Sequence, residues 1–195
     1  MSRPAAIRNT NLINGIRPYQ TGDNRRDIHW GATARTGQMQ VKTHDFTADT
    51  RLMIVLNGQM RPDQWGELMD YETPVIEYGL SLAATAAARV LPCGIPVGFC
   101  ANMPFLESKE CALLPPAWHA TRLDEMLLAL SKIKISRVKR FPTLLTELSA
   151  ARDTDFLILS PYADAEIEGV MEDIRRAGST ATLCLIEPEA RTNEA

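Results

Sequence analysis

Short apolar runs alternate with longer amphipathic segments along most of the chain. Four runs rich in apolar residues have the length of buried β-strands and occupy residues 51–56, 95–100, 155–160 and 180–187. Four helical patterns accompany them, at residues 73–91, 123–130, 141–151 and 164–177. Strands that alternate with helices predict an α/β fold, in which a mostly parallel sheet carries helices on both faces.

Proline and capping residues mark the ends of these predicted elements. Thr73 followed by Pro74 fits an N-cap and the first position of a helix. Pro96 has to lie at the beginning of its strand or on a sheet edge, because proline has no N–H to donate. Residues 102–119 are irregular, with one short strand expected before Pro115.

The first fifty residues have a different pattern. Gly22 permits a sharp turn, Asp23 is the predicted cap of the helix that follows, and Gly37 is its predicted end. Residues 38–45 alternate as expected for a strand. We expect this segment to pack on the α/β domain, and we divide the chain into an N-terminal helix and strand, the domain and a tail, at residues 1–50, 51–188 and 189–195.

Composition and charge narrow the class of function. Of the 195 residues, 45% are hydrophobic and 23% are charged, which is ordinary for a globular protein. No apolar run approaches the ~20 residues of a membrane-spanning helix, and the amino terminus lacks a secretion signal. We therefore expect a cytoplasmic protein, or the soluble part of a membrane-anchored one. A pI near 5.7 argues against nucleic acid as a partner, although residues 1–51 carry eight Lys and Arg against four Asp and Glu.

The cysteines and histidines provide no catalytic or metal-binding pattern. Cys93, Cys100, Cys111 and Cys184 contain no C-x-x-C pair, and we expect reduced thiols in apolar surroundings. No two histidines have the i, i+4 spacing of a helical metal site. The basic residues 132–140 alternate with apolar ones, which predicts an amphipathic edge or linker; contact with a membrane surface or nucleic acid is the alternative.

The densest motif of the chain occupies residues 15–35. Its pattern, G-x-R-x-Y-x-x-G-D-x-x-R-x-I-x-W-x-x-[ST]-A-R, includes Arg17, Tyr19, Asp23, Arg26, Trp30 and Arg35. The pattern resembles the signature of the bacterial family called domain of unknown function 58. The likeness continues through later segments, at residues 41–42, 52–56, 71–73 and 94–98.

This resemblance implies a fold and a partner, but it implies no biochemical activity. Members of the family look like divergent von Willebrand factor A domains, which are Rossmann-like. Their genes usually lie beside genes for MoxR-type AAA+ ATPases, and many members are anchored by amino-terminal membrane helices, which are absent from this sequence. The biochemical activity of the family is not established, and a shared fold does not define a function.

The resemblance also places a degenerate metal site in this chain. A von Willebrand factor A domain commonly binds a divalent cation with a D-x-S-x-S motif after its first sheet strand. Asn57, Gln59 and Arg61 occupy the matching positions, so a neutral amide and a cation replace a carboxylate and a hydroxyl. Tyr162 lies near the position of a later aspartate ligand. Asp164 is the nearby carboxylate that a cation would have to use instead.

Two interpretations of the arginine-rich signature remain open. In the first, the arginines pair with Asp23 and hold the N-terminal segment in place, with Tyr19 and Trp30 packed beneath them. In the second, an acidic or phosphorylated partner binds the arginines, namely Arg17, Arg25, Arg26 and Arg35.

Together these features predict a non-catalytic protein-interaction module that acts with a MoxR-type AAA+ ATPase or another protein, without a cofactor. The expected docking surface is formed by loops at the carboxyl ends of the strands, at residues 57–61, 102–107 and 160–164. The alternative is a divalent-cation-dependent adhesion or ligand-binding domain that uses Asp164. An enzyme that acts on a phosphorylated substrate ranks below both, because no base or nucleophile is evident.

Overall fold

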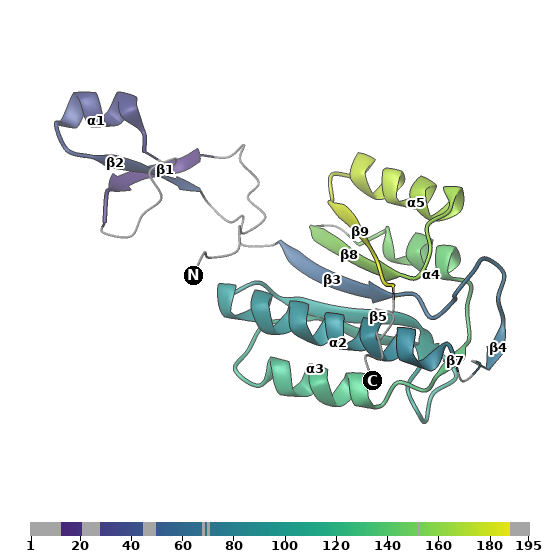
Figure 1. Cartoon of the computed structure of the whole chain (residues 1–195). Coiled ribbons are helices and arrows are strands. Elements are labelled where there is room, and N and C mark those ends of the chain that lie inside the picture. The colour runs from purple at the N-terminus through teal and green to yellow at the C-terminus, as the bar shows by residue number, and fades with distance from the viewer. Residues whose placement is uncertain are drawn as a thin grey trace, which may run out of the picture. The chain divides into compact units, whose positions relative to one another are not determined.

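The chain forms two compact units, Met1–Asp49 and Thr50–Ala195 (Figure 1). The computed structural model describes residues 13–20, 28–44, 50–67, 69, 71–151 and 153–187. Each unit has a sheet of its own.

The N-terminal unit contains a two-stranded antiparallel sheet and a short helix. Strand β1 (Ile13–Pro18) pairs with β2 (Gln40–His44), and helix α1 (Trp30–Thr36) lies between them in the sequence. The helix ends at Gly37, as predicted. Its φ of 68° is the left-handed conformation that glycine adopts at little cost.

Helix α1 is capped by a residue that the sequence analysis did not select. The Nδ1 atom of His29 accepts a hydrogen bond from the Ala32 N–H at 3.0 Å. The prediction that Asp23 caps this helix is wrong, because a cap has to adjoin the first helical residue, here Trp30. Asp23 itself lies outside the described residues.

The α/β unit is built on a mixed five-stranded sheet with the order β6-β5-β3-β8-β9. Strands β5, β3, β8 and β9 run parallel to one another, and β6 is antiparallel to β5. The elements of this unit are, in chain order, β3 (Arg51–Leu56), β4 (Gly66–Glu67), α2 (Thr73–Val90), the 3-10 helix η2 (Leu91–Cys93), β5 (Val97–Pro104), β6 (Cys111–Ala117), α3 (Arg122–Ser131), β7 (Ser136–Arg137), α4 (Phe141–Leu148), β8 (Thr154–Ser160), α5 (Ala165–Arg176) and β9 (Ala181–Leu185).

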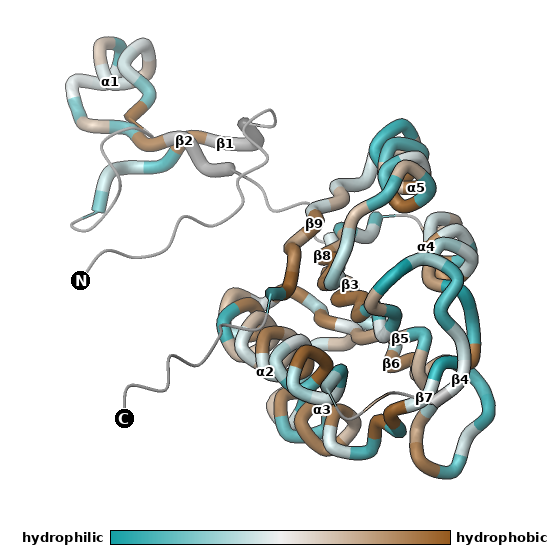
Figure 2. The backbone as a smooth tube through the Cα atoms, turned by 45° about the vertical axis from the view of Figure 1, so that its right-hand side comes forward, coloured by the Kyte–Doolittle hydropathy of each residue, from teal (hydrophilic) through white to brown (hydrophobic). Residues whose placement is uncertain are grey.

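Alternation along the strands divides the core between the two faces of the sheet. Ile54 and Leu56 of β3 belong to the cluster formed with α2 and α3, whereas Met53 and Val55 belong to the cluster formed with α4 and α5. These four side chains are nearly or fully buried, and burial of a side chain of this kind contributes about 1.5–3 kcal/mol. Strands β3, β8 and β9 are accordingly hydrophobic along most of their length (Figure 2).

The structure confirms an α/β class with a mostly parallel sheet and corrects several boundaries. Glu72, and not Thr73, occupies the N-cap position of α2, and it makes no side-chain cap bond. The segment expected to be irregular contains the full strand β6, in which Pro115 and Pro116 are tolerated because β6 lies at a sheet edge. The short strands β4 and β7, which pair with each other, were not predicted.

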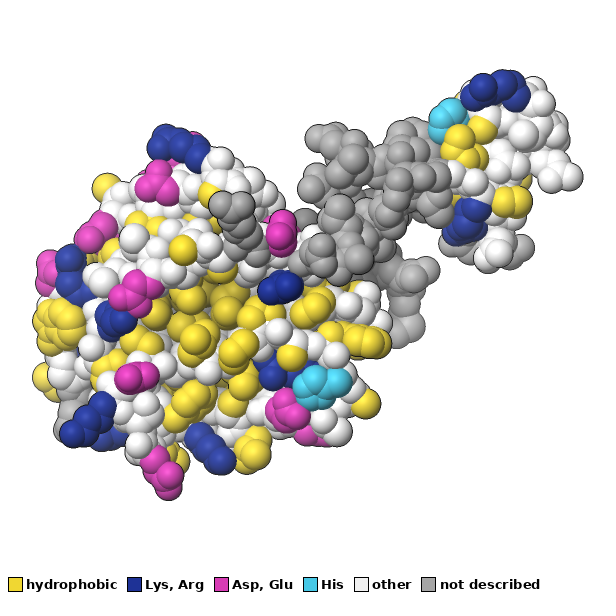
Figure 3. Space-filling view, turned by 180° about the vertical axis from the view of Figure 1, so that it is seen from behind, with side chains coloured by type: hydrophobic (Ala, Val, Ile, Leu, Met, Phe, Trp, Pro, Cys, Tyr) yellow, Lys and Arg dark blue, Asp and Glu magenta, His cyan; other side chains and the backbone are white. Residues whose placement is uncertain are grey.

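Charged and apolar side chains are unevenly distributed on the surface of the α/β unit. On the face seen in Figure 3, hydrophobic side chains gather at the centre and many charged side chains lie around them. Among the described residues, no helix has both the length and the apolar character needed to cross a membrane.

Candidate functional site

Polar residues from three neighbouring strands meet at the carboxyl edge of the five-stranded sheet. Asn57 follows the last residue of β3, Asn102 lies in the second half of β5, and Ser160 ends β8. Each of the three is 0% exposed. Because these strands run parallel, their carboxyl ends lie at the same edge, where open α/β sheets normally bind ligands.

The amide groups of Asn57 and Asn102 are used within the turn that follows β3. Asn57 Nδ2 donates to Ser160 Oγ at 3.0 Å, and Asn57 Oδ1 accepts from the Gln59 N–H at 2.9 Å. Asn102 Oδ1 accepts from the Gly58 N–H at 2.7 Å, and Asn102 Nδ2 donates to Gln59 Oε1 at 3.3 Å. A buried amide or N–H without a partner would cost about 1–3 kcal/mol, so this bonding stabilises the turn.

Gln59 joins the same turn to the start of α4. Its Oε1 accepts the Phe141 N–H at 2.7 Å, and its Nε2 donates to the Gln64 carbonyl oxygen at 3.0 Å. The N-cap residue of α4, Arg140, provides no side-chain cap, and Gln59 supplies the acceptor that the first turn of the helix requires. Gln59 is therefore a structural link with 1% exposure.

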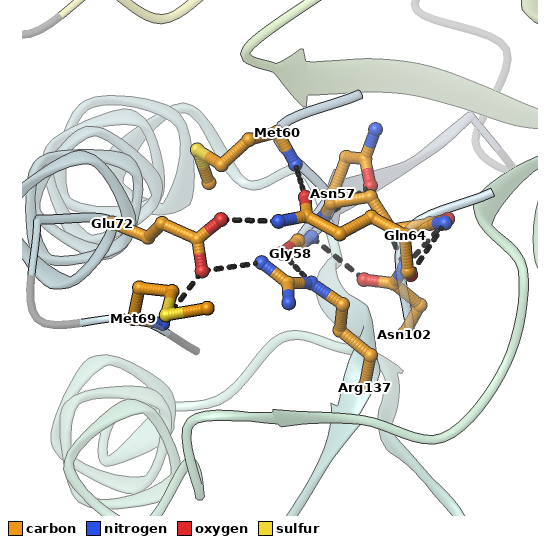
Figure 4. A network of polar contacts seen from close by, with 9 residues as sticks. Asn57, Gly58, Met60, Gln64, Met69, Glu72, Asn102 and Arg137 are labelled. Atoms are coloured by element: carbon orange, nitrogen blue, oxygen red, sulfur yellow. Dashed lines mark hydrogen bonds and ion pairs between the residues drawn. The ribbon is translucent and has the colours of Figure 1, made fainter. Parts of the chain in front are cut away.

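A buried ion pair completes this polar network. Arg137 Nη2 donates to Glu72 Oε2 at 2.9 Å, and Arg137 Nε donates to the Gly58 carbonyl oxygen at 2.8 Å (Figure 4). The two charged side chains are 1% and 0% exposed. One guanidinium thereby ties β7 both to the start of α2 and to the turn after β3.

Glu72 is held as a carboxylate despite its burial. Burial alone raises the pKa of Glu72, but hydrogen bonds from the Met69 N–H, Arg137 and the Gln64 side chain outweigh it. The resulting pKa lies below the ordinary value of 4.5. All of these donors serve to keep the charge of Glu72 in place inside the protein.

The other two residues selected for the metal position lie apart from this network. The Arg61 side chain is exposed. Asp164 is the N-cap of α5, and its Oδ1 accepts the Ile167 N–H at 2.8 Å. Tyr162 is partly buried and packs against the apolar cluster beneath α4 and α5. Among the residues that the structure describes, no three His, Cys, Asp or Glu side chains come together as a metal site would require.

Large apolar side chains are exposed in two loops next to the buried network. The segment between β3 and α2 exposes Trp65, Met69 and Tyr71, at 54%, 61% and 73%. The loop that joins β5 to β6 adds Leu106, which is 62% exposed. Exposed large apolar side chains from two loops near one edge of a sheet are typical of a protein-binding surface.

The arginine-rich signature lies in the N-terminal unit and its described members are not buried together. Arg35 is exposed, and its Nε donates to the Gly31 carbonyl oxygen at 3.2 Å, within its own helix. Arg17 Nη1 donates to the adjacent Pro18 carbonyl oxygen at 3.1 Å. Tyr19 is partly buried, and its N–H donates to the Met39 carbonyl oxygen.

Trp30 is exposed within the N-terminal unit. We expected Trp30 to pack beneath the arginines; within its own unit it is 69% exposed, and its packing against the α/β unit stays a prediction. As the first residue of α1 it turns its side chain outward, and the small Ala32 occupies the buried position of the helix. The remaining members of the signature, Asp23, Arg25 and Arg26, lie outside the described residues.

The cysteines are free thiols in the structure. Cys100 lies in the middle of β5, where burial raises its pKa to about 12. Burial also raises the pKa of Cys111 on the neighbouring strand. A thiol of this kind is neutral at physiological pH and therefore a poor nucleophile.

Sequence reasoning missed Glu72, Arg137 and Gln64 as members of the network, and it placed Asn102 in a docking loop at residues 102–107, whereas Asn102 is buried in β5. Asn102 carried a usable signal, because it interrupts the apolar run that continues β5 to Met103. Arg137 carried none, since it is one of five basic residues in a segment that was predicted as an amphipathic edge or linker with its charged side in solvent. Its burial depends on Glu72, which is 65 positions away in the sequence.

Fold and site together define an α/β protein with an internally bonded polar edge. The family described as "Protein of unknown function DUF58" matches residues 15–154, which is more than half of the chain, so the chain belongs to this family. No curated protein matches it. The solved structure of proximal thread matrix protein 1 (PTMP1) from the mussel byssus is similar at 10% identity and a TM-score of 0.47, over 69% of this chain and 37% of that one.

Proposed function

We propose that this chain is a non-catalytic protein-interaction module that acts with a MoxR-type AAA+ ATPase through the carboxyl edge of its sheet. The observation that carries the proposal is the contrast at this edge. The polar side chains are buried and bonded to one another, whereas the neighbouring exposed side chains are large and apolar. Such an edge offers a surface for a protein and little for a small polar substrate.

The proposal includes a fold related to the von Willebrand factor A domain with a degenerate metal site. The strand order and the single antiparallel edge strand support this relation. At the matching position Asn57 and Gln59 bring neutral amides, and the charged pair beside them, Arg137 and Glu72, is already neutralised. Mg²⁺ requires several free oxygen ligands, at least one of them a carboxylate, to compensate for its dehydration.

Trp65, Met69 and Tyr71 are the proposed contacts with the ATPase. Tyrosine and tryptophan carry a large share of the binding energy in protein interfaces, because they bury much area at a small entropic cost. Alanine substitution at a central position of this kind weakens binding by about 2 kcal/mol or more, which is at least a ~30-fold rise in dissociation constant.

A binding experiment with a matched control tests this surface. The full chain and a MoxR-type ATPase encoded by the same genome are purified and titrated by calorimetry with ATP, with ADP and without nucleotide. Binding is expected in at least one state, and Trp65→Ala with Tyr71→Ala should abolish it. Trp118→Ala is the control, because Trp118 is equally exposed (58%) but follows β6 near the amino end of β5. No binding in any state, or equal loss in the control, would contradict the proposal.

Calorimetric titration with Mg²⁺ and Mn²⁺ separates this function from a cation-dependent one. Asp164 is the carboxylate that such a function would use, and it is occupied as the cap of α5. We expect no heat of binding to the wild-type chain. A stoichiometric heat that disappears in Asp164→Asn would establish the cation-dependent alternative.

A further inference from the structure

The two edges of the five-stranded sheet differ in how their backbone groups are protected. Strand β6 contains Pro115 and Pro116, which offer no N–H to another strand, and Arg122 donates to the Pro115 carbonyl oxygen. Strand β9 at the other edge contains no proline. Arg175 occupies one outward carbonyl oxygen of β9, that of Ala181, so the part of this edge that a further strand can pair with is its centre at Leu183.

The odd-numbered residues of β9 direct their backbone groups away from β8. The Thr180 carbonyl oxygen accepts an N–H of β8 at 2.8 Å, and the Ile186 N–H donates to a carbonyl oxygen of β8 at 2.9 Å. The backbone N–H and C=O groups of the even-numbered residues therefore point toward β8. Arg175 Nη2 donates to the outward Ala181 carbonyl oxygen at 2.8 Å. Within the part of the chain that the structure describes, the N–H and C=O of Leu183 have no hydrogen-bond partner.

This edge is complementary to itself in an antiparallel arrangement. If Leu183 of one copy lies opposite Leu183 of a second copy, Ala181 of each copy lies opposite Leu185 of the other. All of these residues are odd-numbered, so their backbone groups point outward from β8. Ala181 is small and buried, whereas Leu185 is 51% exposed. Leu185 is therefore the apolar side chain that this pairing would cover, and the small, buried Ala181 leaves room for it.

The charges beside β9 are complementary in the same arrangement. An open groove of about 610 Å³ between α5 and β9 is lined by Glu168, Glu172 and Arg175. The bond from Arg175 to Ala181 places the end of α5 beside the start of β9. Glu168 lies seven residues before Arg175, about 10 Å away along α5. Strand β9 covers a similar length, ~13 Å, between Ala181 and Leu185, so Glu168 lies near the Leu185 end of the strand.

A two-fold axis at Leu183 would bring the acidic part of α5 in one copy to the basic end of α5 in the other. Glu168 would face Arg175 of the second copy at both ends of the paired strands. Opposite charges that face each other across an antiparallel interface favour this register.

We propose that a second copy of this chain docks on β9, so that two five-stranded sheets join into one continuous sheet. The backbone groups of Leu183 supply the central hydrogen bonds, and the exposed Leu185 side chain supplies apolar surface at each end of the paired strands. The dimer is isologous, because each copy contributes the same residues to it. Its test needs the chain alone, so the result is independent of binding to an ATPase.

Two substitutions at equally exposed leucines provide the first test. Sedimentation velocity over a wide range of concentrations is expected to give twice the 21.6 kDa of one chain. Leu185→Lys should raise the dissociation constant of the dimer about tenfold or more, because it places a charge in the interface. Leu113→Lys on β6, where Leu113 is 50% exposed, should leave the dimer unchanged. Thermal melting verifies that both variants are folded.

Charge exchange on α5 provides the second test. Glu168→Arg alone should weaken the dimer, and the combination with Arg175→Glu in the same chain should restore it, since the pairs across the axis are opposite again. Three results would overturn the proposal: a monomer at every concentration, equal weakening by the two leucine substitutions, or no restoration in the double variant. A monomer whose Leu183 amide is protected from hydrogen exchange would assign the edge to residues 188–195 of the same chain.

Discussion

The arginine-rich signature of the N-terminal unit and the buried network of the α/β unit are both polar, but their side chains have different surroundings. Arg35 is exposed and donates to its own helix. Arg137 is buried and holds three segments together through Glu72 and Gly58. The signature is dense in sequence, whereas the network is assembled from positions far apart in the chain.

This comparison shows that the density of a motif in the sequence does not measure how much its side chains contribute to the stability of the fold. An exposed arginine keeps its hydration, so its hydrogen bonds in the folded state add little to stability. The buried Arg137 guanidinium donates hydrogen bonds to Glu72 and to a backbone carbonyl oxygen in place of water. Removal of Arg137 would therefore leave the Glu72 carboxylate buried with an incomplete set of donors. We therefore expect large effects in the network and small ones at described positions of the signature.

The largest expected effect follows the removal of Arg137. In Arg137→Ala, Glu72 remains as a buried charge and the Gly58 carbonyl oxygen loses a donor. The free energy of unfolding of the α/β unit should fall by about 3–5 kcal/mol. Urea denaturation measures this change, with Arg176→Ala as the control, because Arg176 is 69% exposed. A loss below about 1 kcal/mol would mean that the pair is not a major stabilising contact.

A smaller effect is expected from acid, with a definite sign. The pKa of Glu72 is lower in the folded protein than its ordinary value of 4.5, so its carboxylate contributes stability above that pH. The contribution is lost as the pH falls through the folded pKa. The gap in free energy of unfolding between the wild type and Glu72→Gln should be constant near pH 7 and narrow below about pH 4.5. A gap that widens toward low pH would contradict the assignment.

Most of the fold follows from local patterns, and the network does not. Apolar runs located β3, β8 and β9 within a few residues, because strands buried on both faces have a continuous apolar signature. Strand β6 was largely missed, since two prolines make it unlike a strand unless its place at an edge is known. The short strands β4 and β7 have no signature of their own, because two residues cannot show a period.

The site was predicted in location but not in its bonding. Asn57 and Gln59 follow an apolar strand, which is sufficient to place them at the carboxyl edge of a sheet. Their partners could not be predicted, because Asn102 and Phe141 approach them only through tertiary packing. Asp164 was predicted as the first residue of a helix and is its N-cap, a role that competes with the metal-binding role considered for it.

The smallest effect is expected at Arg35, and it decides between the two interpretations of the signature. A latched arginine would cost about 3–5 kcal/mol on removal, whereas Arg35→Ala should change the free energy of unfolding by less than about 0.5 kcal/mol. The reason is its exposure and its intrahelical bond to Gly31. Thermal melting measures the change, and Ala32→Asp, at the buried position of the same helix, is a destabilising control. A large loss in Arg35→Ala would identify Arg35 as a structural latch, and a neutral result leaves its guanidinium available to an acidic partner.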